Sequence, residues 1–382
     1  MFSCFRARRP AAGSKNQQPA APMPPPPLIP YGSSYSTEME GTMENKRWDS
    51  LDSWSMLLDP GGGVADQQAS SLSADQREEW MVDLSQLFIG NKFASGSNSR
   101  IYRGIYRQRA VAVKMVRLPE RDEERRRALE EQFNSEVAFL SRLRHPNVVQ
   151  FVAACKRPPV YCIITEYMSQ GTLRMYLHKK DPCSLSPETV LRLALDVARG
   201  MEYLHAQGVI HRDLKSHNLL LNDDMRVKVA DFGTSCLEAH GTNMGTYRWM
   251  APEMVRDRPC TRKVDVYSFG IVLWELTTCL VPFQGMTPVQ AAYAACEKNA
   301  RPSLSPACPP ALNSMIKMCW AGNPARRPEF SYIVSVLEKY DHCLREGLPL
   351  VPPPSPASSF LSSIFELGSC LSSDLPSIPV HV

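Results

Sequence analysis

The clearest pattern in this chain is a polar motif near its middle, His-Arg-Asp-Leu-Lys-Ser-His-Asn, which runs from His211 to Asn218. The apolar run Leu219–Leu221 follows at once, and the triplet Asp231–Gly233 comes 13 residues after Asn218. An Asp-Phe-Gly triplet alone is an ordinary turn, and an isolated polar loop is ordinary surface. At this spacing the two motifs instead indicate one site that gathers carboxylate, amide and ammonium groups.

Two further patterns fit a site of this kind. Lys114 ends the strand-like run Val111–Val113, so its ammonium group would project from a sheet, and Glu136 on the next helix is its expected partner in an ion pair. A strand-end lysine by itself is usually just solvated. Farther on, Glu253 of the Ala-Pro-Glu triplet has a candidate buried partner in Arg327.

Taken together, these motifs resemble those of the eukaryotic protein kinases over about 260 residues of the chain. The matching positions are Lys114, Glu136, His211–Asn218, Asp231–Gly233, Ala251–Glu253, Asp265 and Arg327. The resemblance implies an α+β, bilobal fold: a small antiparallel sheet with one main helix, and a larger helical lobe. It also implies ATP and Mg²⁺ as cofactors and a protein bearing Ser or Thr as substrate.

The resemblance assigns a role to each catalytic motif. Asp213 would orient the substrate hydroxyl, and Lys215 would neutralise charge on the γ-phosphate. Lys114, held by Glu136, would contact the α- and β-phosphates. Asn218 and Asp231 would bind magnesium through their side-chain oxygens.

A second group of residues is expected to hold the nucleotide. By resemblance Thr165 is the gatekeeper, Glu166 and Met168 belong to the hinge whose backbone meets adenine, and Leu220 lies beneath the ring. Ile101 and Ala112 complete this group. We expect Val113, Met115 and Leu140 to be core residues instead.

The loop expected to cover the phosphates departs from the family pattern G-x-G-x-x-G. It contains only the middle glycine of the three, and its residues are Ala94, Ser95, Gly96, Ser97, Asn98 and Ser99. Glycine permits positive φ and close approach to phosphate. Small side chains at the other two positions predict weaker ATP binding than a three-glycine loop gives, within about tenfold.

Lys215 is the residue that serine/threonine kinases carry at this position, so a tyrosine or dual-specificity kinase is the less favoured alternative. A pseudokinase scaffold is also disfavoured, since Lys114, Asp213 and Asp231 are all present. Residues 245–253 and 265–270 resemble the tyrosine-kinase-like group, specifically the plant Raf-like kinases classed with MAP kinase kinase kinases. Residues 93–114 and 48–58 resemble a member of that family that acts in stomatal movement in response to carbon dioxide.

Secondary-structure patterns predict a kinase domain over residues 84–345, with an N-lobe at 84–165, a hinge at 166–171 and a C-lobe at 172–345. Alternation predicts a hairpin over 99–117 with a turn at 107–109, and strands over 148–154 and 160–165. A charged helix is expected over 121–144. Ser186 as N-cap, Pro187 at the first position and Gly208 after the end predict another helix.

The segment between Asp231 and Glu253 is the expected site of regulation. Arg212 beside Asp213 suggests control by a phosphate, with Thr242 as the first candidate and Thr234 and Ser235 behind it. We expect Thr246 to contact Asp213 and Lys215 structurally. Cys236 is more simply an inert small side chain than a redox switch.

Residues 1–83 and 346–382 are expected to be disordered because they are rich in proline or in proline and serine. Trp48, Leu51, Trp54 and Leu58 have near-helical spacing; we expect this segment to pack on the chain's own domain, with a partner protein as the alternative. The first charged residues, Arg6 to Lys15, are basic and could contact a membrane surface.

The bulk composition excludes several classes of protein. The chain has 43 basic and 39 acidic residues, a net charge of +4 that gives no reason to expect nucleic acid. We expect no transmembrane segment, because no apolar run is long enough. Twelve scattered cysteines without metal-ligand spacing predict reduced thiols in the cytosol or nucleus. We expect a cytoplasmic protein, with the plasma-membrane periphery as a second location and MAP kinase cascade members as candidate partners.

Overall fold

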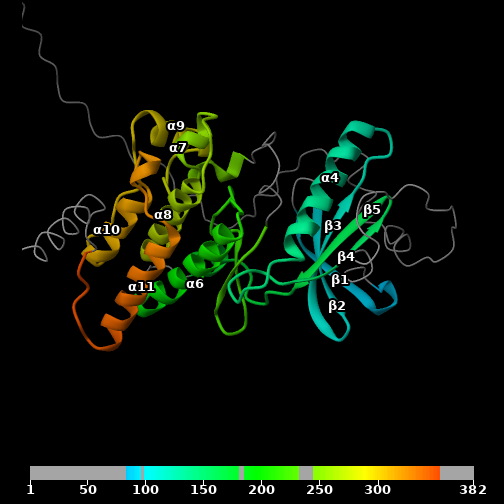
Figure 1. The fold of residues 1–382 in the computed structure, drawn as a ribbon, viewed down its shortest axis with the longest axis horizontal. Coiled ribbons are helices and arrows are strands. Elements are labelled where there is room, and N and C mark those ends of the chain that lie inside the picture. The colour runs from blue at the N-terminus through cyan, green and yellow to red at the C-terminus, as the bar shows by residue number, and fades with distance from the viewer. Residues whose placement is uncertain (1–82, 96–98, 180–184, 232–243, 353–382) are drawn as a thin grey trace, which may run out of the picture. The chain divides into compact units, whose positions relative to one another are not determined.

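The computed structural model describes residues 83–95, 99–179, 185–231 and 244–352. Within these residues a β-sheet with one long helix is followed along the chain by a helical part (Figure 1). This is the predicted α+β arrangement of a bilobal kinase fold. The regions predicted to be disordered, including the tryptophan-bearing segment, lie outside the described residues except for Asp83 and 346–352. No helix in the described ranges is both long and apolar enough to cross a bilayer.

The sheet has five antiparallel strands in the order β1-β2-β3-β5-β4. They are β1 (Leu87–Ser95), β2 (Ser99–Tyr106), β3 (Arg109–Arg117), β4 (Phe151–Arg157) and β5 (Val160–Glu166), preceded by the short helix η1 (Leu84–Gln86). The predicted hairpin is confirmed. Arg107 and Gln108 connect β2 to β3 with φ of 46° and 64°, the left-handed backbone that a tight two-residue hairpin turn needs.

The predicted start of β4 is wrong by three residues. Val148 forms an isolated parallel bridge with Val229 of the helical part, and its neighbour Val149 donates its backbone N–H to the Val229 carbonyl at 2.9 Å. Because Val148 is already paired there, β4 begins only at Phe151. This short stretch therefore ties the sheet to the strand that precedes Asp231.

The helix beside the sheet is α4 (Glu123–Leu140), shorter at both ends than the predicted 121–144. Asp122 caps it, with its side chain accepting from the Arg125 backbone N–H at 2.9 Å. The predicted apolar positions Phe133, Val137 and Leu140 are buried. Phe133 packs on Tyr161 of β5 with 4.9 Å between ring centroids, which fixes the helix against one face of the sheet.

The helical part is built around α6 and α8. Its elements are α5 (Leu173–His178), α6 (Pro187–Ala206), β6 (Leu219–Leu221), β7 (Val227–Val229), η2 (Met244–Arg248), α7 (Pro252–Val255), α8 (Lys263–Thr278), α9 (Pro288–Glu297), α10 (Pro310–Cys319), η3 (Pro324–Arg326) and α11 (Phe330–Arg345). Helix α6 has the predicted cap: Ser186 accepts from the Thr189 N–H at 3.3 Å, and Pro187 is the first helical residue. Nearly every residue of α8 is buried.

Candidate functional site

The cation of the site comes from β3 and its partner from α4. Lys114 Nζ lies 2.7 Å and 3.0 Å from the two carboxylate oxygens of Glu136, so the predicted ion pair is present. Burial by itself lowers the pKa of Lys114, but the charges of Glu136 and Asp231 outweigh that effect and the pKa is raised. Lys114 is therefore a fixed positive charge on one face of the sheet, on its central strand.

Asp231 reaches the same cation from the helical part. Its Oδ1 lies 3.8 Å from Lys114 Nζ, and just over half of its side chain is exposed. Its φ of 63° is left-handed, a conformation that costs energy in a residue other than glycine. Ala230, the residue before Asp231, is held by two hydrogen bonds. Its backbone N–H donates to the Asn218 carbonyl at 2.9 Å, and its backbone carbonyl accepts from His211 Nε2 at 3.1 Å.

The side chains of the 211–218 loop converge on Asp213. Lys215 Nζ donates to the two Asp213 carboxylate oxygens at 3.0 Å and 2.7 Å, and Asn218 Nδ2 donates to the same carboxylate at 2.9 Å. Lys215 also donates to Thr246 Oγ1 at 2.8 Å, which is the predicted structural contact with Lys215. The loop thus presents one carboxylate whose direction is set by two neighbours.

Two buried acids that were not assigned roles from the sequence hold this loop from below. Asp265, at the start of α8, accepts the backbone N–H groups of His211 and Arg212 at 2.9 Å and 2.8 Å, and it pairs with His205 Nε2 at 2.8 Å. Glu275, three turns farther along α8, accepts from the Ser216 hydroxyl at 2.8 Å. The signal in the sequence is an acid within an otherwise apolar stretch, since a buried carboxylate needs nearby donors.

The residues expected around adenine lie on both sides of the connection between sheet and helices. Register places Ala112 opposite Thr165, and Ile101 opposite Lys114. Met168 packs with Val149 and Ala230, and Leu220 packs against the same group. This places Leu220 beside the residue that precedes Asp231.

Glu166 has a contact that sequence reasoning missed. Its carboxylate accepts from Lys228 Nζ at 2.6 Å and from the Gln150 backbone N–H at 2.7 Å. Its own backbone N–H donates to the Gln150 carbonyl at 3.0 Å. The side chain of Glu166 therefore secures the connection to β7, and neither its carboxylate nor its backbone N–H is left for a nucleotide.

The phosphate-covering loop is only partly described. Ala94 and Ser95 are the last residues of β1 and Ser99 is the first of β2, whereas Gly96, Ser97 and Asn98 lie outside the described residues. Ala94 and Ser99 are not among the residues with positive φ, so their side chains cause no backbone strain. Glycine is therefore not needed at these two positions for a positive φ. Its remaining advantage there is that the backbone can approach the phosphates closely.

The oxygen atoms at the site suit a hard divalent cation. Asn218 uses its side-chain nitrogen on Asp213, at both the carboxylate and the backbone carbonyl, which leaves its side-chain oxygen as the atom for a cation. The exposed Asp231 carboxylate follows the residue that hydrogen-bonds Asn218. Carboxylate and amide oxygens are the ligands that Mg²⁺ accepts.

Similarity to known proteins agrees with this geometry. A family model described as protein tyrosine and serine/threonine kinase matches residues 87–337. The chain belongs to the protein kinase family. It is 64% identical over 377 residues to the serine/threonine/tyrosine-protein kinase HT1 of Arabidopsis thaliana, with 97% of this chain and 95% of that protein covered.

Two other Arabidopsis thaliana proteins are similar over the kinase domain alone. The serine/threonine-protein kinase STY46 is 42% identical over 269 residues, which cover 69% of this chain and 46% of that protein. For the serine/threonine-protein kinase STY17 the identity is 40% over 272 residues, covering 70% and 47%. The chain is thus a plant Raf-like protein serine/threonine kinase, for which ATP and a divalent metal are the expected cofactors.

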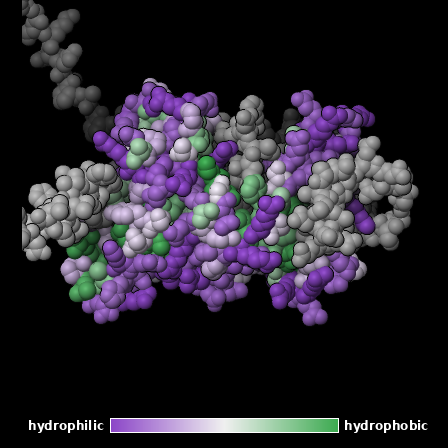
Figure 2. Space-filling model, viewed as in Figure 1, coloured by the Kyte–Doolittle hydropathy of each residue, from purple (hydrophilic) through white to green (hydrophobic). Residues whose placement is uncertain are grey.

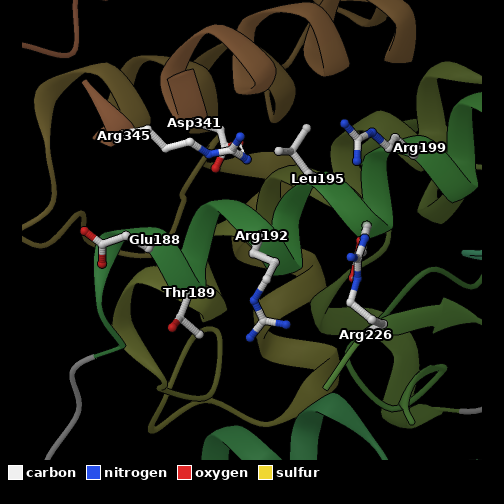
Figure 3. Close-up of a pocket in the computed structure, with 9 residues that line it drawn as sticks. Glu188, Thr189, Arg192, Leu195, Arg199, Arg226, Asp341 and Arg345 are labelled. Carbon is white, nitrogen blue, oxygen red and sulfur yellow. Dashed lines mark hydrogen bonds and ion pairs between the residues drawn. The ribbon is translucent and has the colours of Figure 1, made fainter. Parts of the chain in front are cut away.

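A separate pocket lies away from this site, between α6 and α11 (Figure 3). Its arginines are held by neighbouring acids or carbonyls: Arg226 Nε donates to Asp196 at 2.9 Å, and Arg192 donates to the Met225 carbonyl at 2.6 Å. None of the residues that line it belongs to the candidate site. The lining residues are Glu188, Thr189, Arg192, Leu195, Asp196, Arg199, Arg226, Asp341 and Arg345.

Proposed function

We propose that this kinase transfers the γ-phosphoryl group of ATP to serine or threonine of a protein substrate, with Asp213 as the residue that accepts or orients the substrate hydroxyl. One observation carries the proposal: Lys114 Nζ lies within 3.8 Å of both Glu136, from the sheet's helix, and Asp231, from the helical part. A cation held between two acids of different elements is ready to pair with phosphate oxygens as they enter.

Each side chain then has one task. Lys114 binds the α- and β-phosphates, and Lys215 stabilises the charge that develops on the transferred group. Asn218 and Asp231 hold Mg²⁺, which neutralises phosphate charge when bound. The same proposal gives nucleotide binding to the predicted group, which comprises Ala94, Ser95, Gly96, Ser97, Asn98, Ser99, Ile101, Ala112, Thr165, Glu166, Met168 and Leu220.

The cellular role is proposed from resemblance. The 64% identity to HT1 over nearly the whole of both chains supports a role in a signalling cascade of stomatal movement in response to carbon dioxide. MAP kinase cascade members are the proposed partners, and the cytoplasm is the proposed location, with the basic N-terminus able to contact the plasma membrane. HT1 is named a serine/threonine/tyrosine-protein kinase, so phosphotyrosine is the second candidate product, opposed here by Lys215.

The test is phosphorylation of a generic protein substrate by purified full-length protein with labelled ATP, followed by phosphoamino acid analysis. Asp213→Asn and Lys114→Met should each abolish incorporation, and the wild type should label serine or threonine. Asp224→Asn and Lys317→Met, exposed residues outside the site, are the matched controls and should keep full activity.

Two results would count against this proposal. Incorporation that survives Asp213→Asn would remove that carboxylate from the reaction. Label found on tyrosine as well as on serine or threonine would instead favour dual specificity. Lys215 would then not be a sufficient indicator of serine/threonine specificity.

A further inference from the structure

Both faces of the five-stranded sheet carry buried side chains. One face carries Lys114 and Tyr161 and packs on α4. The register of the strands places a second set of side chains on the opposite face, which we call the outer face. Its buried residues are Leu87, Tyr102, Tyr106, Val111, Val113, Met115, Ala153, Cys155, Cys162 and Ile164, whereas Lys92 and Arg100 of the same face are exposed or half-buried.

Each of these ten side chains is buried, with at most 5% of its surface exposed. On the face with Lys114, Tyr161 and Ile163 are buried in a cluster with residues of α4, whereas Phe88 and Ile105 of the β1–β2 pair are 68% and 52% exposed. A single sheet cannot bury its own side chains to this degree, because they stand perpendicular to it and need a second layer about 10 Å away. The outer face must therefore be covered.

Among the described residues, no long helix provides this cover. Helix α4 is the long helix beside the sheet in Figure 1, and its contacts through Phe133, Glu130 and Glu136 are with side chains of the other face. The helices that follow α4 along the chain belong to the helical part. The cover has to come from elsewhere in the same chain.

The course of the chain at Asp83 indicates where the cover starts. The Asp83 backbone N–H donates to the Tyr106 hydroxyl at 3.3 Å, and Leu87 four residues later is itself an outer-face residue. The residues that precede Asp83 therefore leave from this face.

We propose that residues 55–82 cover the outer face and form the second layer of the small lobe. Fully extended, such a segment reaches about 90 Å, whereas a five-stranded sheet is only about 20 Å wide. The segment also carries enough apolar side chains for the task. They are Met56, Leu57, Leu58, Val64, Leu72, Trp80, Met81 and Val82.

Two cysteines make the proposal measurable. Cys155 and Cys162 are directly opposite each other in the β4–β5 pair and point into the outer face, where they are 5% and 0% exposed. Removing the cover would expose both thiols to solvent, whereas Cys319, fully buried in α10, would stay protected. Thiol labelling therefore reports on the cover independently of kinase activity.

The first experiment compares maleimide labelling of full-length wild type with a full-length variant in which those eight apolar residues are replaced by serine. Cys155 and Cys162 should be as slow as Cys319 in the wild type and about tenfold faster or more in the variant. Phe88→Ser, at an exposed position on the other face of the same sheet, is the matched control and should change neither rate. Rates at Cys155 and Cys162 that stay equal to that of Cys319 in the variant would overturn the proposal.

A second experiment leaves the segment intact, so it is informative even where the serine variant unfolds. Tyr102→p-benzoylphenylalanine places a photocrosslinker on the outer face of the full-length chain. Crosslinked peptides should fall within residues 55–82 of the same chain. Crosslinks to a second chain, or to any other part of the sequence, would show that something else covers this face.

Discussion

At the scale of single residues, Glu275 has an unusual environment beneath the catalytic loop. Its carboxyl is fully buried in α8 and accepts from Ser216 Oγ and Trp249 Nε1, both at 2.8 Å. Burial raises the pKa of Glu275 to about 7, against the opposing effect of these two hydrogen bonds and of Arg174. The group is therefore close to half protonated near neutral pH.

This pKa predicts a pH-dependent stability. The folded chain holds a proton on Glu275 up to about pH 7, whereas the unfolded chain releases it near 4.5. The stabilisation that comes from protonated Glu275 is complete below pH 4.5 and is lost as the pH rises through 7. The free energy of unfolding therefore falls by about 3 kcal/mol over this pH range. Urea denaturation between pH 5 and 8 should show this fall in the wild type and a smaller one in Glu275→Gln. Parallel curves for the two proteins would contradict the assignment.

The sequence predicted the contacts of site residues that belong to recognisable motifs, but not contacts between residues far apart in the chain. Lys114, Glu136, Asp213 and Lys215 were predicted because each belongs to a motif with known spacing, and the structure brings Lys114 to Glu136 and Lys215 to Asp213. The support from Asp265 was not predicted. Its partners lie 53 to 60 residues away, so only the fold reveals them.

At the scale of elements, the limits of a helix were predictable only where local chemistry sets them. Ser186 and Pro187 mark the start of α6 through a side-chain hydrogen bond and a fixed φ, and both are readable in the sequence. The start of β4 depends on Val148 pairing with Val229, a contact across the lobes that no local pattern encodes. Tertiary contacts decided the boundary there.

The packing of α6 on β7 gives a prediction for Gly200. Alanine favours a helix over glycine by about 1 kcal/mol in isolation. Here, however, a Cβ at Gly200 would lie 2.6 Å from the Asn147 carbonyl oxygen, which also accepts from the Val229 N–H at 2.9 Å. Since that carbonyl is backbone and already engaged, Gly200→Ala should destabilise the kinase by about 1–3 kcal/mol. Thermal denaturation would measure this, and a variant more stable than the wild type would show that α6 can shift.

At the scale of the whole molecule, the order of strands and then helices predicted the two-part architecture correctly. On the face of the molecule that Figure 2 shows, hydrophilic and hydrophobic residues are mixed over the described surface. Val113 and Met115 of the sheet's outer face are buried, as predicted for core residues. The burial of the other residues on that face was not predicted, because alternation along a strand does not show that both faces are covered. That information exists only once the strands are paired.

Helix α7 is joined to the far end of the helical part by a buried ion pair. Arg327 donates to the two carboxylate oxygens of Glu253 at 2.5 Å and 2.9 Å, and to the carbonyls of Ala321 and Lys263 at 2.8 Å and 2.9 Å. The arginine side chain has no exposed surface, and the two partners are 74 residues apart. The pair therefore connects α7 to the loop before α11.

Breaking this pair from one side should be far more harmful than removing both partners. Arg327→Met leaves the Glu253 carboxylate buried without its cation, so we expect a loss of about 3–5 kcal/mol in the free energy of unfolding. The double variant Glu253→Gln/Arg327→Met should lose much less than the sum of its two single variants, because no buried charge remains. Arg199→Met is the matched control: Arg199 and Glu338 form an exposed pair at 2.8 Å, whose loss should cost under about 1 kcal/mol. Denaturation curves that put Arg327→Met level with Arg199→Met would mean that water reaches Glu253 and that the connection does not depend on the pair.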